Sequence, residues 1–187
     1  TMTEYARVAF LDADMLVVKN MDEVFELPLQ EGFIAACHAC RCNPNQIESY
    51  PLSWQPDNCY YSWCEDDEMT AHPPATLDNY FNAGFLVLTP DQALYDLMLT
   101  KIVAMADISS YVFAEQDFLN DVFHDRWLPL HYGYNALKTL ELQHPRMWEM
   151  KRVKNLHYII DKPWQIRPEP GDKWYRLHQV WWEYYPH

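Results

Sequence analysis

Apolar residues cluster along this chain in short runs, which polar and proline-rich stretches separate. The first run, residues 8–18, is apolar throughout except for Asp12 and Asp14, and it predicts a buried strand. Comparable short runs predict further strands at 33–37, 80–88, 127–130 and 153–160.

Helices are predicted between and after these strands, because apolar residues recur there at helical spacing. One helix spans about residues 90–105, with Thr89 as its expected N-cap and Pro90 at its first position. Others begin near residue 114 and near residue 172, and Asn20 with Glu23 predicts a capping box on a short helix. Strands that alternate with helices predict a layered α/β fold in one domain, residues 1–187.

Composition and charge exclude several classes of protein. Hydrophobic residues make up 49% of the chain, which excludes disorder. A net charge of −13 argues against a nucleic-acid partner, because phosphate backbones need a basic surface. No apolar run approaches the roughly 18 residues of a transmembrane helix. The odd number of cysteines, five, is typical of a reduced, cytoplasmic protein.

A stretch at about residues 37–79 differs from the rest in being rich in cysteine, proline and aromatic residues. Long loops of this kind inside a compact domain are often functional, although a small satellite core is an equal alternative. The cysteines favour free thiols, and a structural Zn²⁺ site is the weaker interpretation. They are Cys37, Cys40, Cys42, Cys59 and Cys64.

Asp12 and Asp14 lie two residues apart, so in an extended strand both side chains point to one side. Two carboxylates there predict a site for a hard cation such as Mg²⁺ or Mn²⁺, or else a polar turn in which both are solvated. His157, at the end of a predicted strand and close to Lys162, is the best candidate for a third ligand. A lone histidine in that position is more often simply buried or exposed without a ligand. What favours a site is the combination of two carboxylates, one imidazole and one lysine, which suits a metal-bound diphosphate.

Four motifs in this order resemble glycosyltransferase family 8, the retaining family that contains glycogenin and galactinol synthase. The similarity extends from about residue 6 to 185 and is strongest to the galactinol-synthase branch. The motifs are Phe10-Leu11-Asp12-Ala13-Asp14, Phe81-Asn82-Ala83-Gly84, the run from Phe113 to Asn120, and the run from His157 to Trp164.

The resemblance implies a GT-A fold, which is a Rossmann-like α/β domain, and a Mn²⁺-dependent transfer of hexose from UDP-galactose or UDP-glucose. The acceptor would be a polyol, sugar or glycan, with inositol a weaker inference, and a homodimer is compatible with the family. By the resemblance, Asp12, Asp14 and His157 are the metal ligands and Lys162 meets the diphosphate. Ala13 would lie near the ribose. Asn82, Gly84, Glu115 and Gln116 would line the donor sugar, with Glu115 or Gln116 nearest the reacting face.

The chain departs from the family in two places. Members usually carry a glycine between the histidine and the lysine, where this chain has Ile159, Ile160 and Asp161. We expect this turn to alter the grip on phosphate and Asp161 to add unfavourable charge. The nucleotide-binding strands that normally precede Asp12 are absent from the sequence, so we expect an open uridine pocket and an exposed sheet edge.

Two other functions are compatible with parts of the sequence. A fragmentary or inactive sugar-nucleotide-binding protein would explain the missing strands and the turn without glycine, but not the intact ligand set. A haloacid-dehalogenase-like phosphatase would use Asp12 as nucleophile. That site needs Thr or Val four residues after the first Asp, where this chain has Leu16. It also needs a later acidic pair at the end of a strand, and no such pair follows a predicted strand here.

Overall fold

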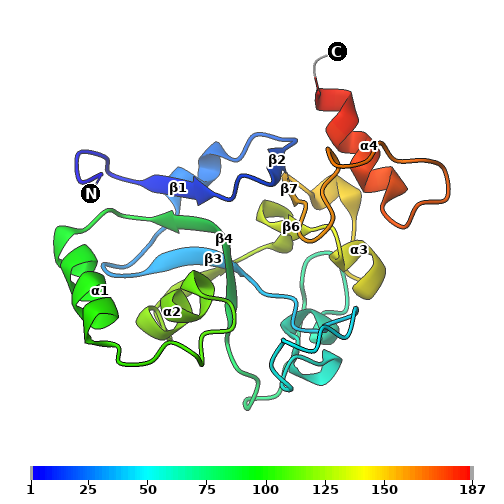
Figure 1. Cartoon of the computed structure of the whole chain (residues 1–187). Coiled ribbons are helices and arrows are strands. Elements are labelled where there is room, and N and C mark those ends of the chain that lie inside the picture. The colour runs from blue at the N-terminus through cyan, green and yellow to red at the C-terminus, as the bar shows by residue number, and fades with distance from the viewer. Residues whose placement is uncertain (1, 186–187) are drawn as a thin grey trace.

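The computed structural model describes residues 2–185, which form two small sheets with helices around them (Figure 1). A four-stranded sheet has the order β1-β4-β3-β5, and a three-stranded sheet has the order β2-β7-β6. The strands are β1 (Val8–Leu11), β2 (Met15–Val17), β3 (Ile34–His38), β4 (Phe81–Leu88), β5 (Trp127–Leu130), β6 (Ala136–Leu137) and β7 (Asn155–His157). The α-helices are α1 (Gln92–Ala104), α2 (Glu115–Val122), α3 (Leu140–Gln143) and α4 (Tyr175–Tyr184).

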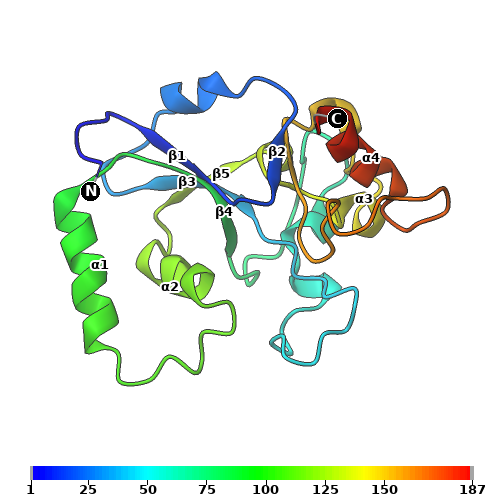
Figure 2. The ribbon, with the colours of Figure 1, turned by 45° about the horizontal axis from the view of Figure 1, so that its top comes forward.

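The larger sheet is mixed rather than parallel. β4 pairs antiparallel with both β1 and β3, and only β3 and β5 are parallel. β3 is buried along its whole length, because α1 and α2 cover one face of the sheet and the short 3₁₀ helix Asp22–Glu26 covers the other (Figure 2). Ile34 and Ala36 pack toward the two helices, whereas Ala35 and Cys37 pack toward the opposite core.

A bulge in β4 interrupts its pairing with β3. Ala36 pairs with Leu86, but the next residue, Cys37, pairs with Asn82. Phe81 and Ala83 face α2, and beyond the bulge Phe85 faces the other core. The alternation of side chains therefore changes phase at Gly84, which is the usual effect of a bulge.

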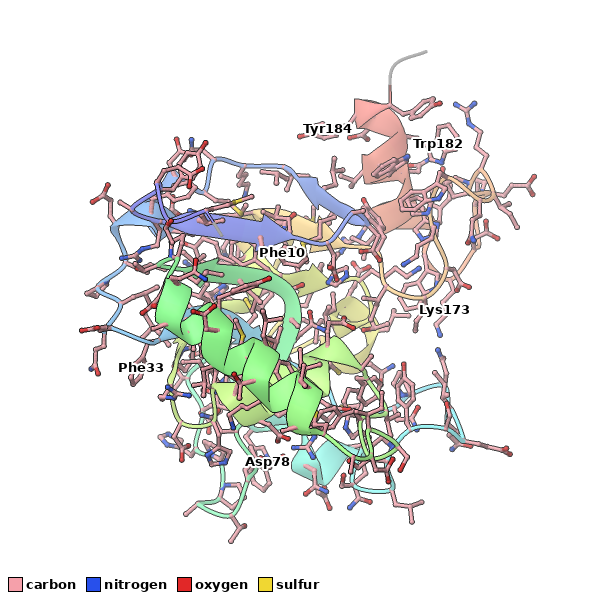
Figure 3. The ribbon with its side chains drawn as sticks, turned by 60° about the vertical axis from the view of Figure 1, so that its left-hand side comes forward. Phe10, Phe33, Asp78, Lys173, Trp182 and Tyr184 are labelled. Carbon is pink, nitrogen blue, oxygen red and sulfur yellow. The ribbon has the colours of Figure 1, made fainter. Side chains whose placement is uncertain are left out.

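The strand predicted at residues 8–18 is wrong in two respects. It is two strands, because a turn at residues 12–15, closed by a hydrogen bond from the amide of Met15 to the carbonyl of Asp12, separates β1 from β2. β1 is not buried either, since it lies at one edge of the sheet and the side chain of Phe10 is 49% exposed (Figure 3). The turn, not an extended strand, therefore sets the directions of Asp12 and Asp14.

The predicted strands at 33–37, 80–88 and 127–130 and the three helices are confirmed, but details of their ends differ. The N-cap of α1 is Asp91, whose carboxylate accepts from the amides of Ala93 and Leu94, and not Thr89. Glu23 closes no capping box, since its carboxylate accepts from Tyr134 and Lys154. The strand predicted at 153–160 shortens to Asn155–His157.

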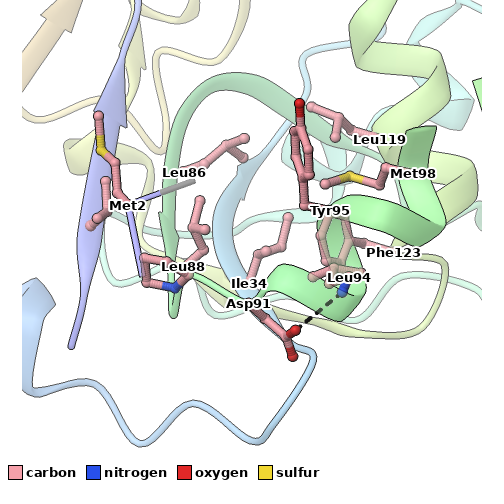
Figure 4. A pocket seen from close by; sticks show the side chains of 12 residues that line it. Met2, Ile34, Leu86, Leu88, Asp91, Leu94, Tyr95, Met98, Leu119 and Phe123 are labelled. Atoms are coloured by element: carbon pink, nitrogen blue, oxygen red, sulfur yellow. Dashed lines mark hydrogen bonds between the residues drawn. The ribbon is translucent and has the colours of Figure 1, made fainter. Parts of the chain in front are cut away.

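An apolar groove runs between α1 and the sheet, and it is lined by Ile34, Leu88, Leu94 and Met98 among others (Figure 4). No residue of α1 is fully buried, although Leu94 and Met98 contact the core. The predicted apolar face of this helix is thus only partly covered, and Leu97 and Ile102 are exposed.

The second sheet and the 39–80 segment share a separate core with α3 and α4. Buried tyrosine and leucine side chains, among them Tyr61, Tyr158 and Leu156, contribute to this core. Within residues 2–185, no helix combines the length and the apolar character that crossing a membrane requires.

Candidate functional site

Three of the side chains singled out in the sequence converge where the two sheets meet. Asp12 follows β1, Asp14 lies in the turn before β2, and His157 ends β7. The Nε2 atom of His157 lies 3.1 Å from Oδ1 of Asp14 and 3.7 Å from Oδ2 of Asp12. One ligand atom from each residue lies within 4.8 Å of the others, a spacing that one cation can bridge. The main chain brings them together because Met15 pairs with His157 across β2 and β7.

The three side chains differ in exposure. The side chain of His157 is only 4% exposed, whereas those of Asp14 and Asp12 are 19% and 43% exposed. His157 therefore lies at the buried base of the site, and the two carboxylates lie on the side that a ligand can reach from solvent.

The pKa values of the two carboxyl groups move in opposite directions. Burial raises the pKa of Asp12, and the negative charge of Asp14 adds to this, although His157 opposes it. Burial alone would also raise the pKa of Asp14, but hydrogen bonds from His157 and Lys162 outweigh it and hold this pKa well below its usual range. Asp14 is therefore ionised throughout the physiological range.

A chain of hydrogen bonds fixes the proton on His157. The amide of Gly84 donates to Asn82 over 3.0 Å, so the acceptor is the Oδ1 oxygen. Asn135 approaches the same oxygen within 2.7 Å and must donate through Nδ2. Its own Oδ1 then faces Nδ1 of His157 at 2.8 Å and accepts a hydrogen bond from the Nδ1–H group. The lone pair of Nε2 is thereby directed at the two carboxylates, so a proton or a metal cation must lie between them.

The same polar chain continues to α2. Oε1 of Gln116 accepts from Nδ2 of Asn82 (3.0 Å) and from the amide of Ala83 (3.1 Å), and its Nε2 donates to the hydroxyl of Tyr80. Gln116 is buried, whereas Glu115 beside it is exposed and close enough for its charge to raise the pKa of Asp12. Both predicted catalytic residues thus lie at the edge of the site, with Gln116 held rigidly.

Gly84 lies directly against the ligand set. A Cβ atom there would come within 2.5 Å of Cε1 of His157, 2.8 Å of Oδ2 of Asp12 and 3.0 Å of Oδ1 of Asn82. These distances are too short for any side chain, so the backbone of β4 approaches the site as only glycine allows.

Lys162 joins the site from the turn after β7. Its ammonium group contacts Oδ2 of Asp14 and donates to the carbonyl of Tyr158 over 2.8 Å. Ala13, expected near a ribose, is exposed at the tip of the turn. Except for Ala13 and Glu115, each predicted site residue is linked to another by a hydrogen bond or an ion pair.

The turn between His157 and Lys162 contains a backbone conformation that its sequence disfavours. Ile160 has a φ of +65°, in the left-handed region that glycine adopts easily. The carboxylate of Asp161, expected to disturb the site, instead accepts from Nε1 of Trp174 over 3.3 Å. The turn therefore holds a β-branched residue in left-handed backbone, at a cost in strain.

Replacing Ile160 by glycine is expected to stabilise the protein. A left-handed backbone costs a non-glycine residue about 1–2 kcal/mol. Glycine removes this cost, but its greater freedom in the unfolded chain offsets about half of the gain. We expect a net gain of about 0.5–1 kcal/mol, or about 2 °C in Tm, by thermal unfolding. Ile159→Gly is the control, since Ile159 packs on the core and has no left-handed backbone. Equal destabilisation by both changes would contradict this account.

Two residues that sequence reasoning missed support this site. Asn135, 1% exposed, follows the 3₁₀ helix Tyr132–Tyr134 and orients His157. Lys138 is fully buried, contacts the carbonyl of Asp161 and lies 3.2 Å from Nε2 of His178. Burial lowers the pKa of Lys138 to about 8. Neither residue belongs to a recognisable motif, because their partners lie far away in the sequence.

Comparison with solved structures defines the class of fold. Apo GlyE from Streptococcus pneumoniae TIGR4 matches 96% of this chain and 39% of its own, with a TM-score of 0.60 and 23% identity. The galactosyltransferase LgtC, solved with donor and acceptor sugar analogs, matches 96% of this chain and 63% of its own, with a TM-score of 0.55 and 17% identity. The fold is therefore GT-A, as expected from the sequence.

The sequence comparisons are more specific. The model of glycosyl transferase family 8 matches residues 1–166, and the chain belongs to this family. Galactinol synthase 1 of Solanum lycopersicum is 31% identical over 97% of this chain and 53% of its own length. Galactinol synthase 5 of Arabidopsis thaliana is 31% identical over 97% of this chain and 54% of its own length. The chain thus spans about half the length of these relatives.

Proposed function

We propose that this chain carries the catalytic site of a retaining hexosyltransferase, which moves a hexose from UDP-galactose or UDP-glucose to an acceptor hydroxyl. The observation that carries this proposal is the convergence of Asp12, Asp14 and His157 on one point, with Lys162 beside them. Family membership and the similarity to galactinol synthases support the donor class and a polyol as acceptor. Family membership also argues against the phosphatase alternative.

The donor set suits a hard divalent cation, with Mn²⁺ the proposed one. Carboxylate oxygens and a neutral imidazole nitrogen are ligands that Mn²⁺ accepts, and the open side of the site leaves room for phosphate oxygens. When bound, the cation supplies positive charge that offsets the charge developing on the departing UDP.

The residues of the chain have distinct tasks in this proposal. The anomeric carbon–oxygen bond to the diphosphate breaks, the acceptor oxygen bonds to the same carbon, and the acceptor's proton passes to the departing diphosphate. Lys162 faces the diphosphate and stabilises its charge. Asn82, Gly84 and Gln116 form a rigid floor under the donor sugar, and Glu115, which is exposed, lies toward the acceptor side. A rigid floor fixes the sugar relative to the incoming hydroxyl, which is where positioning lowers the barrier.

The test is a donor and acceptor screen on the complete gene product in the presence of Mn²⁺. We expect release of UDP from UDP-galactose or UDP-glucose that depends on a polyol, sugar or glycan acceptor. Binding of UDP without transfer to any acceptor would support the inactive-protein alternative and overturn the proposal.

Asn135 is expected to act as a positioning residue for His157. Asn135→Ala removes the acceptor for Nδ1–H, and we expect Mn²⁺ to bind about 10–100-fold more weakly. Asn135→Asp keeps that acceptor, so it should retain Mn²⁺ affinity while losing stability through repulsion with Oδ1 of Asn82. Titration with Mn²⁺ alongside thermal unfolding separates the two effects. Equal loss of Mn²⁺ affinity in both variants would show a merely structural role.

A further inference from the structure

A second group of metal-ligating side chains lies away from the site described above. Cys40 and Cys42 follow β3, Cys59 lies in the 39–80 segment, and His144 caps the C-terminus of α3. Their sulfur atoms and the Nε2 atom all lie within 4.8 Å of one another. Cys42, Cys59 and His144 are buried, and Cys40 is partly buried.

The distances within this group match the edges of a tetrahedron around one metal ion. Nε2 of His144 lies 3.5 Å from Sγ of Cys40, 3.3 Å from that of Cys42 and 3.6 Å from that of Cys59. The sulfur atoms of Cys40 and Cys59 are 4.0 Å apart. Tetrahedral Zn²⁺, with bonds of about 2.3 Å to sulfur and 2.0 Å to nitrogen, gives edges of about 3.5 Å for S···N and 3.8 Å for S···S.

The remaining two cysteines are occupied elsewhere. Cys37, in β3, packs in the core that also contains Val24 and Phe85, and its thiol contacts the carbonyl of His131 at 3.2 Å. The thiol of Cys64 contacts the carbonyl of Tyr60 at 3.8 Å. The set of five thiols considered from the sequence therefore divides into three that converge with a histidine and two that do not.

We propose that Cys40, Cys42, Cys59 and His144 bind one structural Zn²⁺ ion. Three thiolates and one imidazole are a ligand set typical of closed structural zinc sites, which leave no position for substrate. Soft sulfur ligands select Zn²⁺, whereas the carboxylates of Asp12 and Asp14 suit a harder cation. The chain would thus hold two different metals, sorted by ligand chemistry.

The ion would join two parts of the chain that already share a core. Between β3 and β4, residues 39–80 contain only two short 3₁₀ helices, Pro56–Asn58 and Tyr60–Trp63, and an isolated bridge between Cys64 and Ala71. In Figure 1 this segment lies beside α3, whose C-cap is His144. Zinc would fasten the segment to α3 and so fix the stretch that leads into Asn82 and Gly84. This role is independent of the proposed transferase activity.

The experiment is metal analysis of the chain purified without chelators. We expect about one Zn²⁺ per chain in the wild type, in Cys64→Ala and in Asp14→Ala, and none in Cys59→Ala. Cys64→Ala is the matched control because it removes a neighbouring buried thiol outside the ligand set. Asp14→Ala shows that the zinc does not occupy the carboxylate site.

The wild type itself gives a second measurement, in case Cys59→Ala does not fold. Replacement of zinc by Co²⁺ should give the intense thiolate-to-cobalt absorption and the visible bands of tetrahedral coordination, and a thiol-specific mercurial should release the zinc. Absence of zinc and of these bands, a disulfide among the three cysteines in place of metal, or zinc loss in Cys64→Ala would each overturn the proposal.

Discussion

Asp14→Ala is expected to abolish the Mn²⁺-dependent stabilisation of the protein by UDP. Asp14 is the only residue that contacts both His157 and Lys162 among the described residues of the site, so its loss removes one metal ligand and frees the two groups it holds. We expect transferase activity of the complete gene product to fall by about a thousandfold or more, which corresponds to about 4 kcal/mol of lost transition-state stabilisation. The thermal shift with UDP and Mn²⁺ measures binding, and UDP release measures turnover.

Two further variants make the Asp14 result specific. Asp14→Asn keeps the shape of the side chain and removes its charge, so it should lose most of the Mn²⁺ effect. Glu31→Ala removes an exposed carboxylate away from the site and should leave the effect unchanged. A full thermal shift in Asp14→Ala would remove this residue from the ligand set.

Gly84→Ala should have an effect nearly as large, although it removes no functional group. The added methyl group would overlap Cε1 of His157 and Oδ2 of Asp12, so the imidazole and the carboxylate must move apart. We expect Mn²⁺ affinity to fall by about a hundredfold and the free energy of unfolding to fall by about 1–3 kcal/mol, as for overpacked cores. Calorimetric titration with Mn²⁺ and thermal unfolding measure the two quantities.

Gly171→Ala is the control for the glycine change. Gly171 has a φ of +104° and no atom within 4 Å of an added Cβ, so alanine there introduces backbone strain without a collision. It should lower stability and leave Mn²⁺ affinity unchanged. If Gly84→Ala also left Mn²⁺ affinity unchanged, the backbone at Gly84 would not define the site.

Stability should depend on pH through Lys138. Its folded pKa of about 8 lies below that of an unfolded lysine, so between these values the unfolded state binds more protons. The free energy of unfolding therefore rises as the pH increases from about 8 toward the pKa of an unfolded lysine. Below pH 8 this gain is absent. Denaturant unfolding at pH 7 and pH 9.5 should show this difference in the wild type and not in Lys138→Met. Equal pH dependence in both proteins would contradict the assignment.

The elements with the strongest hydrophobic patterns were predictable because their burial is nearly complete. β3 and β4 are buried on both faces, so their apolar runs identify them. The strand over residues 8–18 was misjudged, because its apolar residues belong to two strands and β1 lies at a sheet edge. Local composition does not report which strand lies at an edge.

Candidate ligands were visible in the sequence, and their assignment as ligands stays a prediction. Asp12 and Asp14 are conspicuous because two carboxylates stand in an apolar run, and His157 belongs to a motif with Lys162. Asn135 and Lys138 gave no such signal, since each acts through partners that only the fold brings near. Cys40, Cys42 and Cys59 were visible as a group, but His144 was not.

The sequence by itself determined the family, the GT-A fold and the residues with metal-binding chemistry, because short motifs and buried strands depend on local order. Only the tertiary structure decided how these residues meet. The pairing of β2 with β7 places His157 opposite the aspartate turn, and the bulge in β4 brings Gly84 against both. The choice of Nδ1 of His157 as the hydrogen-bond donor to Asn135 follows from hydrogen bonds across three chain segments, and such long-range contacts have no trace in local sequence.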